Sequence, residues 1–361
     1  MKNELDSADK ELLKDIDAFS QHYAAAGWHI RDKAVKEDLS RVRLFRSSMT
    51  SVQMVLISLK SAMLTDTQFT GVEFHQCVFA EAMLKGVTFT NCKFFDCSFE
   101  RASLVDCRFV TSVSKDIYAR AATFEGCVFE SFEDTSGVYA FAALTKCRFE
   151  RSRFDNGSFH GAKLNATAFK ESALKNTVFT KIEGAGLLFE DSFLHNCGFE
   201  SSVYGAMRFL RGSSKGVTFN KFDTEKPSFQ ACTRIEALLI RACVWTGAAI
   251  EACNEVSELT IDNCKMPGLT INACQLAYFE VLETELSGES AITGCRIAGW
   301  RLEKSTLTGT KIASCAIAGY LNTDGAVFDG AVVTGIAYAS DLKLSAAGVK
   351  YLNGSGELGR R

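Results

Sequence analysis

Cysteine is the residue type with the most chemical potential in this 361-residue chain, which contains 14 cysteines and five histidines. Closely spaced pairs of thiols bind zinc, and thiols of secreted proteins form disulfides. Here Cys92 and Cys97, the closest pair, are five residues apart, too far for a C-x₂-C zinc motif. Twelve of the 14 cysteines lie two residues before a large apolar residue. That regular position predicts a buried, structural role for the thiols.

The spacing that the cysteines follow runs through much of the chain. From position 59 to position 229, residue numbers ending in 4 or 9 give 35 positions, of which Phe fills 19, Leu eight and Tyr two. An amphipathic helix would repeat its apolar residues every 3.6 positions and a half-buried strand every two. A sustained period of five therefore indicates a repeat architecture.

This repeat resembles that of the pentapeptide-repeat family, in which a large central residue follows a small one two positions earlier. The segments Cys92–Asp96, Cys97–Arg101 and Ala162–Ala166 carry the resemblance. It implies an all-β solenoid, a right-handed quadrilateral β-helix with four pentapeptides per turn and both marked residues pointing inward. Cysteines at 107, 127 and 147 fit a 20-residue turn. Residues 54–338 then give about 14 turns.

The thiols also bear on bound groups and on the cellular compartment. Core filling accounts for them without a metal, a disulfide or a cofactor, and we expect none of these. Unpaired thiols in this number favour a reducing compartment, so we expect the protein to be cytoplasmic. The N-terminus places four acidic residues before any apolar run, unlike a Sec signal peptide, which leaves non-Sec export open. No apolar segment is long enough for a membrane span.

The pattern divides the chain into four parts. Residues 1–50 are expected to form a helical cap or docking segment, with a helix over 7–26 that starts at Asp6 or Ser7 and a weaker one over 33–45. Residues 51–230 form the regular Phe-rich β-helix. Residues 231–340 continue it with Ile, Leu and Val, after a join near 220–235. Residues 341–361 form a C-terminal cap and tail, with a short helix over 340–352.

Six of the 35 positions lack a large residue, namely Ser114, Ala119, Asp134, Gly184, Ser214 and Thr224. Segments 112–120, 131–137 and 211–216 around them are polar, and two interpretations stay open: simple decay of the repeat, or outward bulges that form a recognition face. The candidate partner-binding residues are Lys115, Asp134 and Arg211 there, and Trp28 and His29 near the helical end.

Residues arranged for catalysis are hard to find. His75 and His195 share a face but lie six turns apart, about 29 Å, and cannot share a metal or a proton. The chain has no P-loop, dinucleotide fingerprint, G-x-S-x-G or H-E-x-x-H motif. We therefore expect a protein that is not an enzyme.

Two functions from different classes remain. The charges, 40 basic against 43 acidic residues, give a nearly neutral surface that fits neither a polyanion mimic nor a phosphate binder, so nucleic acid is not the expected partner. A filled interior offers no deep pocket, so we expect no small-molecule substrate. A non-catalytic scaffold or adaptor that binds a protein partner is the preferred prediction, and the family resemblance adds a link to bacterial secretion. A DNA-mimicking topoisomerase-binding protein is the alternative that the family also implies. The oligomeric state is open, and an end-to-end dimer is one option.

Overall fold

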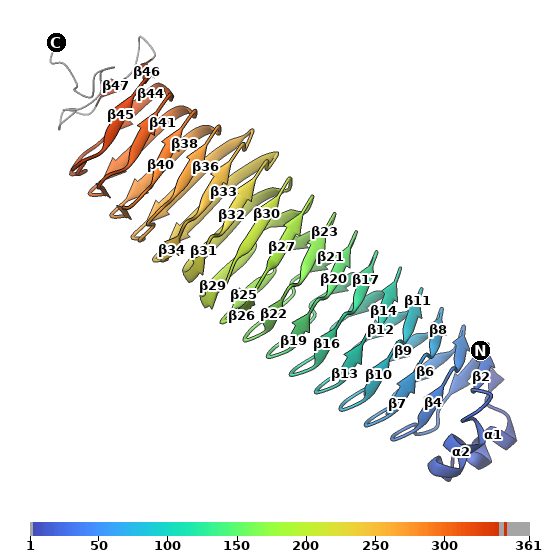
Figure 1. Ribbon diagram of the computed structural model, residues 1–361. Coiled ribbons are helices and arrows are strands. Elements are labelled where there is room, and N and C mark those ends of the chain that lie inside the picture. The colour runs from blue at the N-terminus through green and yellow to red at the C-terminus, as the bar shows by residue number, and fades with distance from the viewer. Residues whose placement is uncertain (1–2, 339–342, 345–361) are drawn as a thin grey trace. The chain divides into compact units, whose positions relative to one another are not determined.

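The computed structural model describes residues 3–338 and 343–344. The chain folds into two compact units, Met1–Ile182 and Glu183–Arg361, here called unit 1 and unit 2. Both are built almost entirely from short parallel strands, and the only helices among the described residues lie between the first and second strands of unit 1 (Figure 1). The predicted four-sided β-helix of pentapeptide repeats is confirmed.

Three faces of unit 1 are parallel ladders with one strand per turn. Ladder 1 contains β4 (Arg43–Phe45), β7 (Met63–Thr65), β10 (Met83–Lys85), β13 (Ser103–Val105), β16 (Thr123–Glu125), β19 (Ala143–Thr145) and β22 (Lys163–Asn165). Ladder 2 contains β2 (His29–Arg31), β5 (Ser48–Thr50), β8 (Gln68–Thr70), β11 (Thr88–Thr90), β14 (Arg108–Val110), β17 (Val128–Glu130), β20 (Arg148–Glu150) and β23 (Ala168–Lys170).

Ladder 3 of unit 1 contains β1 (Asn3–Glu4), β3 (Lys33–Val35), β6 (Gln53–Val55), β9 (Glu73–His75), β12 (Lys93–Phe95), β15 (Val113–Lys115), β18 (Glu133–Thr135), β21 (Arg153–Asp155) and β24 (Ala173–Lys175). The fourth face has single bridges, such as Tyr118 with Val138, and ends in β25 (Val178–Thr180). Partners in register are 20 residues apart, as four pentapeptides per turn require.

The backbone turns each corner through a residue in the left-handed region. Asn91, Asp96, Arg101 and Asp106 have φ of 52 to 54°, and the same conformation recurs every five residues. Non-glycine residues adopt it at a cost of about 1–2 kcal/mol, which the ladder hydrogen bonds on both sides offset. Because the corner falls two positions after the large residue, the large residue and the small one before it both point inward, and the side chains between them point out.

Stacked rings fill the interior of unit 1. Phe69, Phe89, Phe109, Phe129 and Phe149 stack one above another with ring centroids 4.5 to 5.0 Å apart. Each ring belongs to a successive strand of ladder 2, so the stacking distance is the spacing of the strands. The cysteines of unit 1 lie in the small inward positions between such rings, and all of them are free and buried, as the sequence predicts. The thiol hydrogens of this set are donated to main-chain carbonyls.

Positions that lack a large residue are filled from the neighbouring inward position. At Asp134 the residue two positions earlier is Phe132, which is buried and packs against Phe109 and Phe129 with centroids 5.7 and 5.3 Å away. Ile117 does the same beside Ala119. The strands around these positions, β15 and β18, keep their register in ladder 3. The interpretation of 112–120 and 131–137 as outward bulges is therefore wrong.

The N-terminal cap has two short helices where one was expected over residues 7–26. Helix α1 (Ser7–Leu12) is capped by Asp6, whose carboxylate accepts from the Asp9 amide at 2.9 Å. Helix α2 (Ile16–His22) is capped by Asp15, whose carboxylate accepts from the amides of residues 17 and 18. A side chain that bonds to its own local backbone competes with helix continuation, which explains the break.

The second predicted helix, over 33–45, is wrong. Residues 33–35 and 43–45 are the strands β3 and β4, and the repeat starts at β2. Val35, Leu39 and Val42 mimic a helical spacing because one pentapeptide is a residue short. Val35 pairs with Met54 and Leu44 with Leu64 in the ladders, so non-local pairing overrides the local pattern. The early start adds turns to the predicted 14, and ladder 2 alone has eight strands in unit 1.

Unit 2 has a wide and a narrow ladder. The wide ladder contains β28 (Phe193–His195), β29 (Gly198–Tyr204), β31 (Ser213–Glu225), β33 (Arg234–Arg241), β36 (Val256–Asp262), β38 (Gln275–Leu282), β41 (Arg296–Glu303), β44 (Ala316–Asn322), β46 (Ala337–Tyr338) and β47 (Lys343–Leu344). The narrow ladder contains β27 (Leu187–Glu190), β30 (Met207–Leu210), β32 (Ser228–Gln230), β35 (Ala249–Glu251), β37 (Thr270–Asn272), β40 (Ala291–Thr293), β43 (Lys311–Ala313) and β45 (Val332–Thr334).

Four shorter strands complete unit 2: β26 (Glu183–Ala185), β34 (Trp245–Thr246), which pairs with the end of β31, and β39 (Glu285–Leu286) and β42 (Thr306–Leu307), which pair with each other. The compact units divide after Ile182. The join near 220–235, where the side chains change from Phe to Ile and Leu, stays a prediction. Segment 211–216, also interpreted as an outward bulge, enters the wide ladder as the start of β31, with Ser213 paired to Phe193.

Two faces of the β-helix merge in the middle of unit 2. Strand β33 still contains a left-handed residue, Ala237, with φ of 52°. None of the residues of β36, β38 and β41 is left-handed, so each of these strands runs straight through a former corner for seven or eight residues. The result is a wider outer face across three consecutive turns. This face positions the groove described below.

The remaining sequence predictions concern the cysteines of unit 2 and the C-terminus. Cys232 and Cys253, the two cysteines that lie three residues before a large apolar residue, are as buried as the others, so the extra residue is absorbed after each cysteine and not before it. The helix expected over 340–352 and the tail after it lie outside the described residues, except for β47 at Lys343–Leu344.

Candidate binding groove

Two of the five candidate partner-binding residues have buried side chains and cannot contact a partner. Trp28 is 1% exposed, packs edge-on against Phe19 at 5.0 Å and donates from its indole nitrogen to Asp9 at 3.0 Å. It therefore fastens the helical cap to the first turn, where the apolar stripe of the cap needs burial. Asp134 is 2% exposed and points into the β-helix.

Asp134 forms a buried polar cluster with two hydroxyls. Ser114 and Tyr139 both donate to its carboxylate, Tyr139 at 3.1 Å. Burial raises the pKa of Asp134 to about 6, because the two hydroxyl donors only partly replace the water that an ionised carboxylate would bind. The cluster is enclosed and no route to it is evident among the neighbouring rings, so we assign it a structural role.

The other three candidate residues are exposed but do not form one site. His29 contacts Ser48 through Nδ1 at 2.8 Å, at the first turn of unit 1. Lys115 lies in ladder 3 beside Phe95, four turns further on, which is about 19 Å along the β-helix. Arg211 belongs to unit 2 and is held by Glu190 and Asp191. A role for these three in binding stays a prediction.

A groove of about 550 Å³ crosses the merged face of unit 2. Its floor consists of small outward side chains on consecutive strands of the wide ladder, Ser257, Ala277, Ala298 and Ala318. Ala has no atom beyond Cβ and Ser has only Oγ. The face is therefore hollowed at these positions, between neighbours that carry longer side chains. We call this feature the alanine groove.

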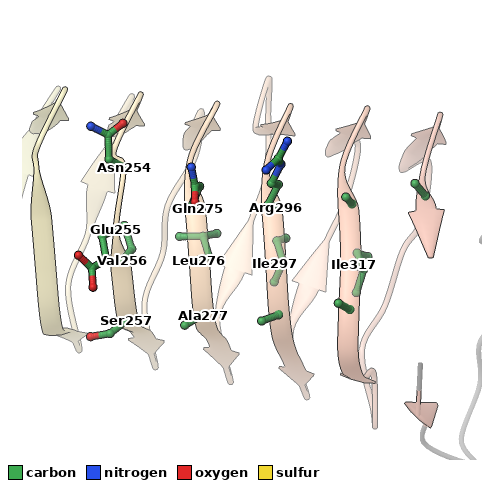
Figure 2. Close-up of a pocket in the computed structure, with 14 residues that line it drawn as sticks. Asn254, Glu255, Val256, Ser257, Gln275, Leu276, Ala277, Arg296, Ile297 and Ile317 are labelled. Atoms are coloured by element: carbon green, nitrogen blue, oxygen red, sulfur yellow. The ribbon is translucent and has the colours of Figure 1, made fainter. Parts of the chain in front are cut away.

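The two rims of the alanine groove differ in chemistry. Asn254, Gln275 and Arg296 form one rim and lie near the same end of three neighbouring strands (Figure 2). On the other side, Tyr278 follows the floor residue Ala277 along β38, next to the groove but outside its lining. The groove therefore offers amide and guanidinium donors on one side and has a phenol ring beside it on the other, above an apolar floor.

The tyrosine side is held in place by a glycine. Gly299 lies between Tyr278 and Tyr320 in the ladder. A Cβ atom on Gly299 would come within 2.6 Å of the Tyr320 ring and 3.3 Å of the Tyr278 ring. Only a residue without a side chain lets both rings close over this strand. Tyr278 itself is 54% exposed and free to stack on a ligand.

Unit 1 has a smaller groove of about 260 Å³ between helix α2 and the first strands of ladder 1. It is lined by Asp17 and Gln21 from the helix and by Arg43, Phe45 and Met63 from the strands. This groove is the place where the expected docking segment meets the β-helix. It mixes opposite charges over an apolar base and offers no feature that selects one ligand.

Within residues 3–338 and 343–344, no three His, Cys, Asp or Glu side chains gather in a way that could hold a metal ion. Neither helix in this part of the chain is long or apolar enough to cross a membrane. The lining of the alanine groove contains one exposed carboxylate, that of Glu255, but no nucleophile with an adjacent base. The arrangement can bind a ligand, and it contains no set of groups arranged for catalysis.

Sequence reasoning missed the alanine groove. Ala277, Ala298 and Ala318 recur at 21 and 20 residues, one turn apart, at outward positions directly after a large inward residue. That recurrence was readable in the sequence, whereas the loss of a corner in β36, β38 and β41 was not, because no residue type marks it. The predicted recognition residues came instead from gaps in the inward pattern, and those gaps are filled inside the core.

Three comparisons place the chain among known proteins. The family model for pentapeptide repeats matches residues 73–109, in eight copies. A comparison with curated protein sequences gave no match. Among solved structures, a trypsin-treated form of QnrB1, a plasmid-mediated fluoroquinolone resistance protein, is similar at 17% identity over 62% of this chain and 92% of its own, with a TM-score of 0.31.

Two further structures illustrate the range of these likenesses. HetL, a pentapeptide-repeat protein involved in heterocyst differentiation regulation in the cyanobacterium Nostoc, is 12% identical over 89% of this chain and 93% of its own, with a TM-score of 0.22. The tailspike protein of E. coli bacteriophage HK620 is 10% identical over 95% and 78%, with a TM-score of 0.32. At TM-scores below 0.5 none of these likenesses bears on the function of this chain.

Proposed function

Because this chain is a pentapeptide-repeat protein, we propose that it is a non-catalytic scaffold or adaptor that binds a protein partner on the outer surface of its β-helix. The alanine groove is the observation that carries the proposal. The interior is packed with stacked rings, and two internal cavities, lined in part by Phe129 and by Ser214, are about 10 Å³ each, the size of one water molecule. The outer groove is some fifty times larger and is open to a partner.

Repeat solenoids support such a role in general, because each turn contacts only its neighbours and leaves a long regular surface for binding. Most interface energy comes from a few anchoring aromatic and arginine side chains. Both types are present here, Arg296 on the rim of the alanine groove and the exposed Tyr278 beside it. The apolar floor between these anchors would lose contact with water when a partner binds.

Photo-cross-linking in the full-length protein tests the proposal. Benzoylphenylalanine in place of Ala298 puts the reactive group in the groove, and the same replacement of Ala291, an outward alanine of the narrow ladder, is the matched control. We expect one protein from a lysate of the source organism to be cross-linked reproducibly from position 298 and not from 291. Equal labelling from both positions, or none from either, would count against a scaffold that binds through this groove.

Association with bacterial secretion is the finer part of this proposal, and the family resemblance is its only support. The 14 free and buried thiols support folding in a reducing compartment such as the cytoplasm, and they leave later non-Sec export open. Fractionation of the source cells tests this part. The protein is expected in the cytoplasm or, after export, in the medium without removal of an N-terminal segment.

A further inference from the structure

Arg296, on the rim of the alanine groove, is a cation without a carboxylate partner. Unit 2 has five arginines between residues 211 and 301. Four of them make ion pairs, Arg211 with Asp191, Arg234 with Glu236, Arg241 with Asp262 and Arg301 with Glu303. Arg296 has no carboxylate within 4.0 Å among the described residues, and its partners in the ladder are Gln275 and Ala316.

The position of this guanidinium favours an anionic group on a ligand. A fully exposed ion pair adds little, about 0 to 1 kcal/mol, because water competes for both charges. Beside the methyl groups of Ala298 and Ala318, a bound carboxylate would be shielded from water on one side, which strengthens a charge-assisted hydrogen bond. The planar guanidinium also matches a carboxylate in a two-point contact.

The backbone of the groove floor is not free to bind a ligand. The amides of Gln275 and Arg296 donate to the carbonyls of Cys253 and Cys274 at 3.1 and 2.9 Å, and the ladder continues on both sides. A ligand therefore cannot join as an additional strand, because strand addition needs an unpaired sheet edge. Recognition in this groove has to come from side chains, namely the amides of the rim, the guanidinium and the phenol.

The dimensions fit a short extended segment. The groove runs from the turn of β36 to the turn of β46, four turn spacings or about 19 Å. An extended chain covers that length with about six residues. Because the floor is made of alanine and serine side chains, small apolar side chains can approach it closely, and the amides of Asn254 and Gln275 can bond to the peptide groups of the segment.

Carboxylates at one end of the groove argue against a polyanion. Glu255 lines the β36 end, where it also faces Arg234 at 3.6 Å, and Glu258 lies on β36 and is exposed. A nucleic acid would bring several phosphates against them, whereas a peptide with a single acidic residue needs only Arg296. Like charges placed face to face lower the affinity, so this end selects against polyanions.

We propose that the alanine groove binds an extended peptide segment of about six residues, in which one Asp or Glu side chain pairs with Arg296 and small apolar side chains lie on the alanine floor. This inference rests on the proposed scaffold function and specifies the chemistry of its partner. Tyr278 stacks on the segment at the opposite rim and fixes its lateral position.

A selection of seven-residue peptides displayed on phage, carried out on the immobilised full-length protein, tests this chemistry. We expect enrichment of sequences with one acidic residue flanked by Ala, Ser or Val. For a synthetic peptide of that sequence, Arg296→Gln should weaken binding about tenfold, as the loss of a charge-assisted hydrogen bond implies. Arg296→Glu should change the selected residue from acidic to basic, a result that loss of folding cannot produce.

The second part of the experiment fills the floor of the alanine groove with a large side chain. Ala298→Trp should abolish enrichment, whereas Ala291→Trp on the narrow ladder should leave the selected sequences unchanged. Selection of the same acidic peptides by Arg296→Glu would overturn the inference, as would tighter binding of a single-stranded oligonucleotide than of the peptide. A partner that is cross-linked from position 298 but binds Arg296→Glu and the wild type with equal affinity would overturn the inference. It would leave the proposed scaffold function intact.

Discussion

Buried Asp134 makes the stability of unit 1 depend on pH. Its carboxyl has a pKa of about 6 in the folded protein, against an ordinary value of 3.8. A difference of about two pKa units corresponds to roughly 3 kcal/mol between the two protonation states. Because the folded-state pKa is raised, the stabilising form is the neutral one. That stability is fully present below about pH 3.8 and is lost as the pH rises through 6.

Asp134→Asn separates this effect from the loss of contacts. The amide keeps one acceptor oxygen for one of the two hydroxyls, and the hydroxyl that faces its NH2 group can accept instead of donating. The amide has nearly the same volume as the carboxyl, but it does not ionise. Between pH 4 and pH 7.5 the wild type should lose about 2 kcal/mol of unfolding free energy relative to the variant. At pH 7.5 the variant should therefore be the more stable protein, which is unusual for a substitution inside a core.

Urea unfolding followed by tryptophan fluorescence measures this difference. Trp245→Phe and Trp300→Phe remove the two tryptophans of unit 2 and leave Trp28 to report on unit 1. Glu133→Gln, on the exposed side of the same strand, is the control for loss of a carboxylate. If the stability of the wild type and of Asp134→Asn changed in parallel from pH 4 to pH 7.5, the reasoning on burial would be refuted.

Three further predictions concern the core and the surface. Phe132→Ala should lower the free energy of unfolding in urea by about 3–5 kcal/mol, because Phe132 fills the volume beside Ser114 and Asp134. Phe95→Ala at an outward position should cost far less. Similar costs would contradict the claim that Phe132 takes the place of the large residue missing at Asp134. An aromatic disulfide reagent should modify none of the 14 thiols in the native protein and all of them in urea. Every thiol is buried, and burial raises the pKa of Cys92 to about 12. Rapid labelling of the native protein would contradict a closed core. A supercoiling assay should show no topoisomerase inhibition, because cross-turn ion pairs such as Lys93–Glu73 leave no acidic stripe on that face; inhibition at low protein concentration would favour the DNA-mimic alternative.

The inward side chains explain how much of the fold was predictable. A large residue every five positions can be satisfied only by a backbone that turns at the same interval, so the stacks of Phe69, Phe89 and Phe109 follow directly from the sequence. Small inward residues must accompany them, which placed the cysteines correctly. The prediction failed where the large residue stands in the position that usually holds the small one, as Phe132 does beside Asp134. In the sequence, the missing large residue at position 134 looks like a loss of the core.

The N-terminal segment and the alanine groove could not be predicted in this way, for other reasons. Val35 and Leu39 have helical spacing, and only pairing with a strand one turn away identifies them as part of the β-helix. The apolar residues of the cap correctly predicted helices, but the side chain of Asp15, which divides α1 from α2, acts locally and carries no periodic signal. Outward alanines are common on any surface, so Ala298 gains meaning only when the merged face aligns it with its neighbours.

The most direct test of the account is the affinity of the purified partner, identified by cross-linking from position 298, for three full-length proteins. The wild type and Ala291→Trp should bind it within twofold of each other, about the scatter expected of a substitution outside the interface. Ala298→Trp should bind at least about tenfold more weakly, since the indole occupies the floor of the alanine groove. Equal affinities for Ala298→Trp and the wild type would contradict the claim that this protein works by binding a partner in that groove.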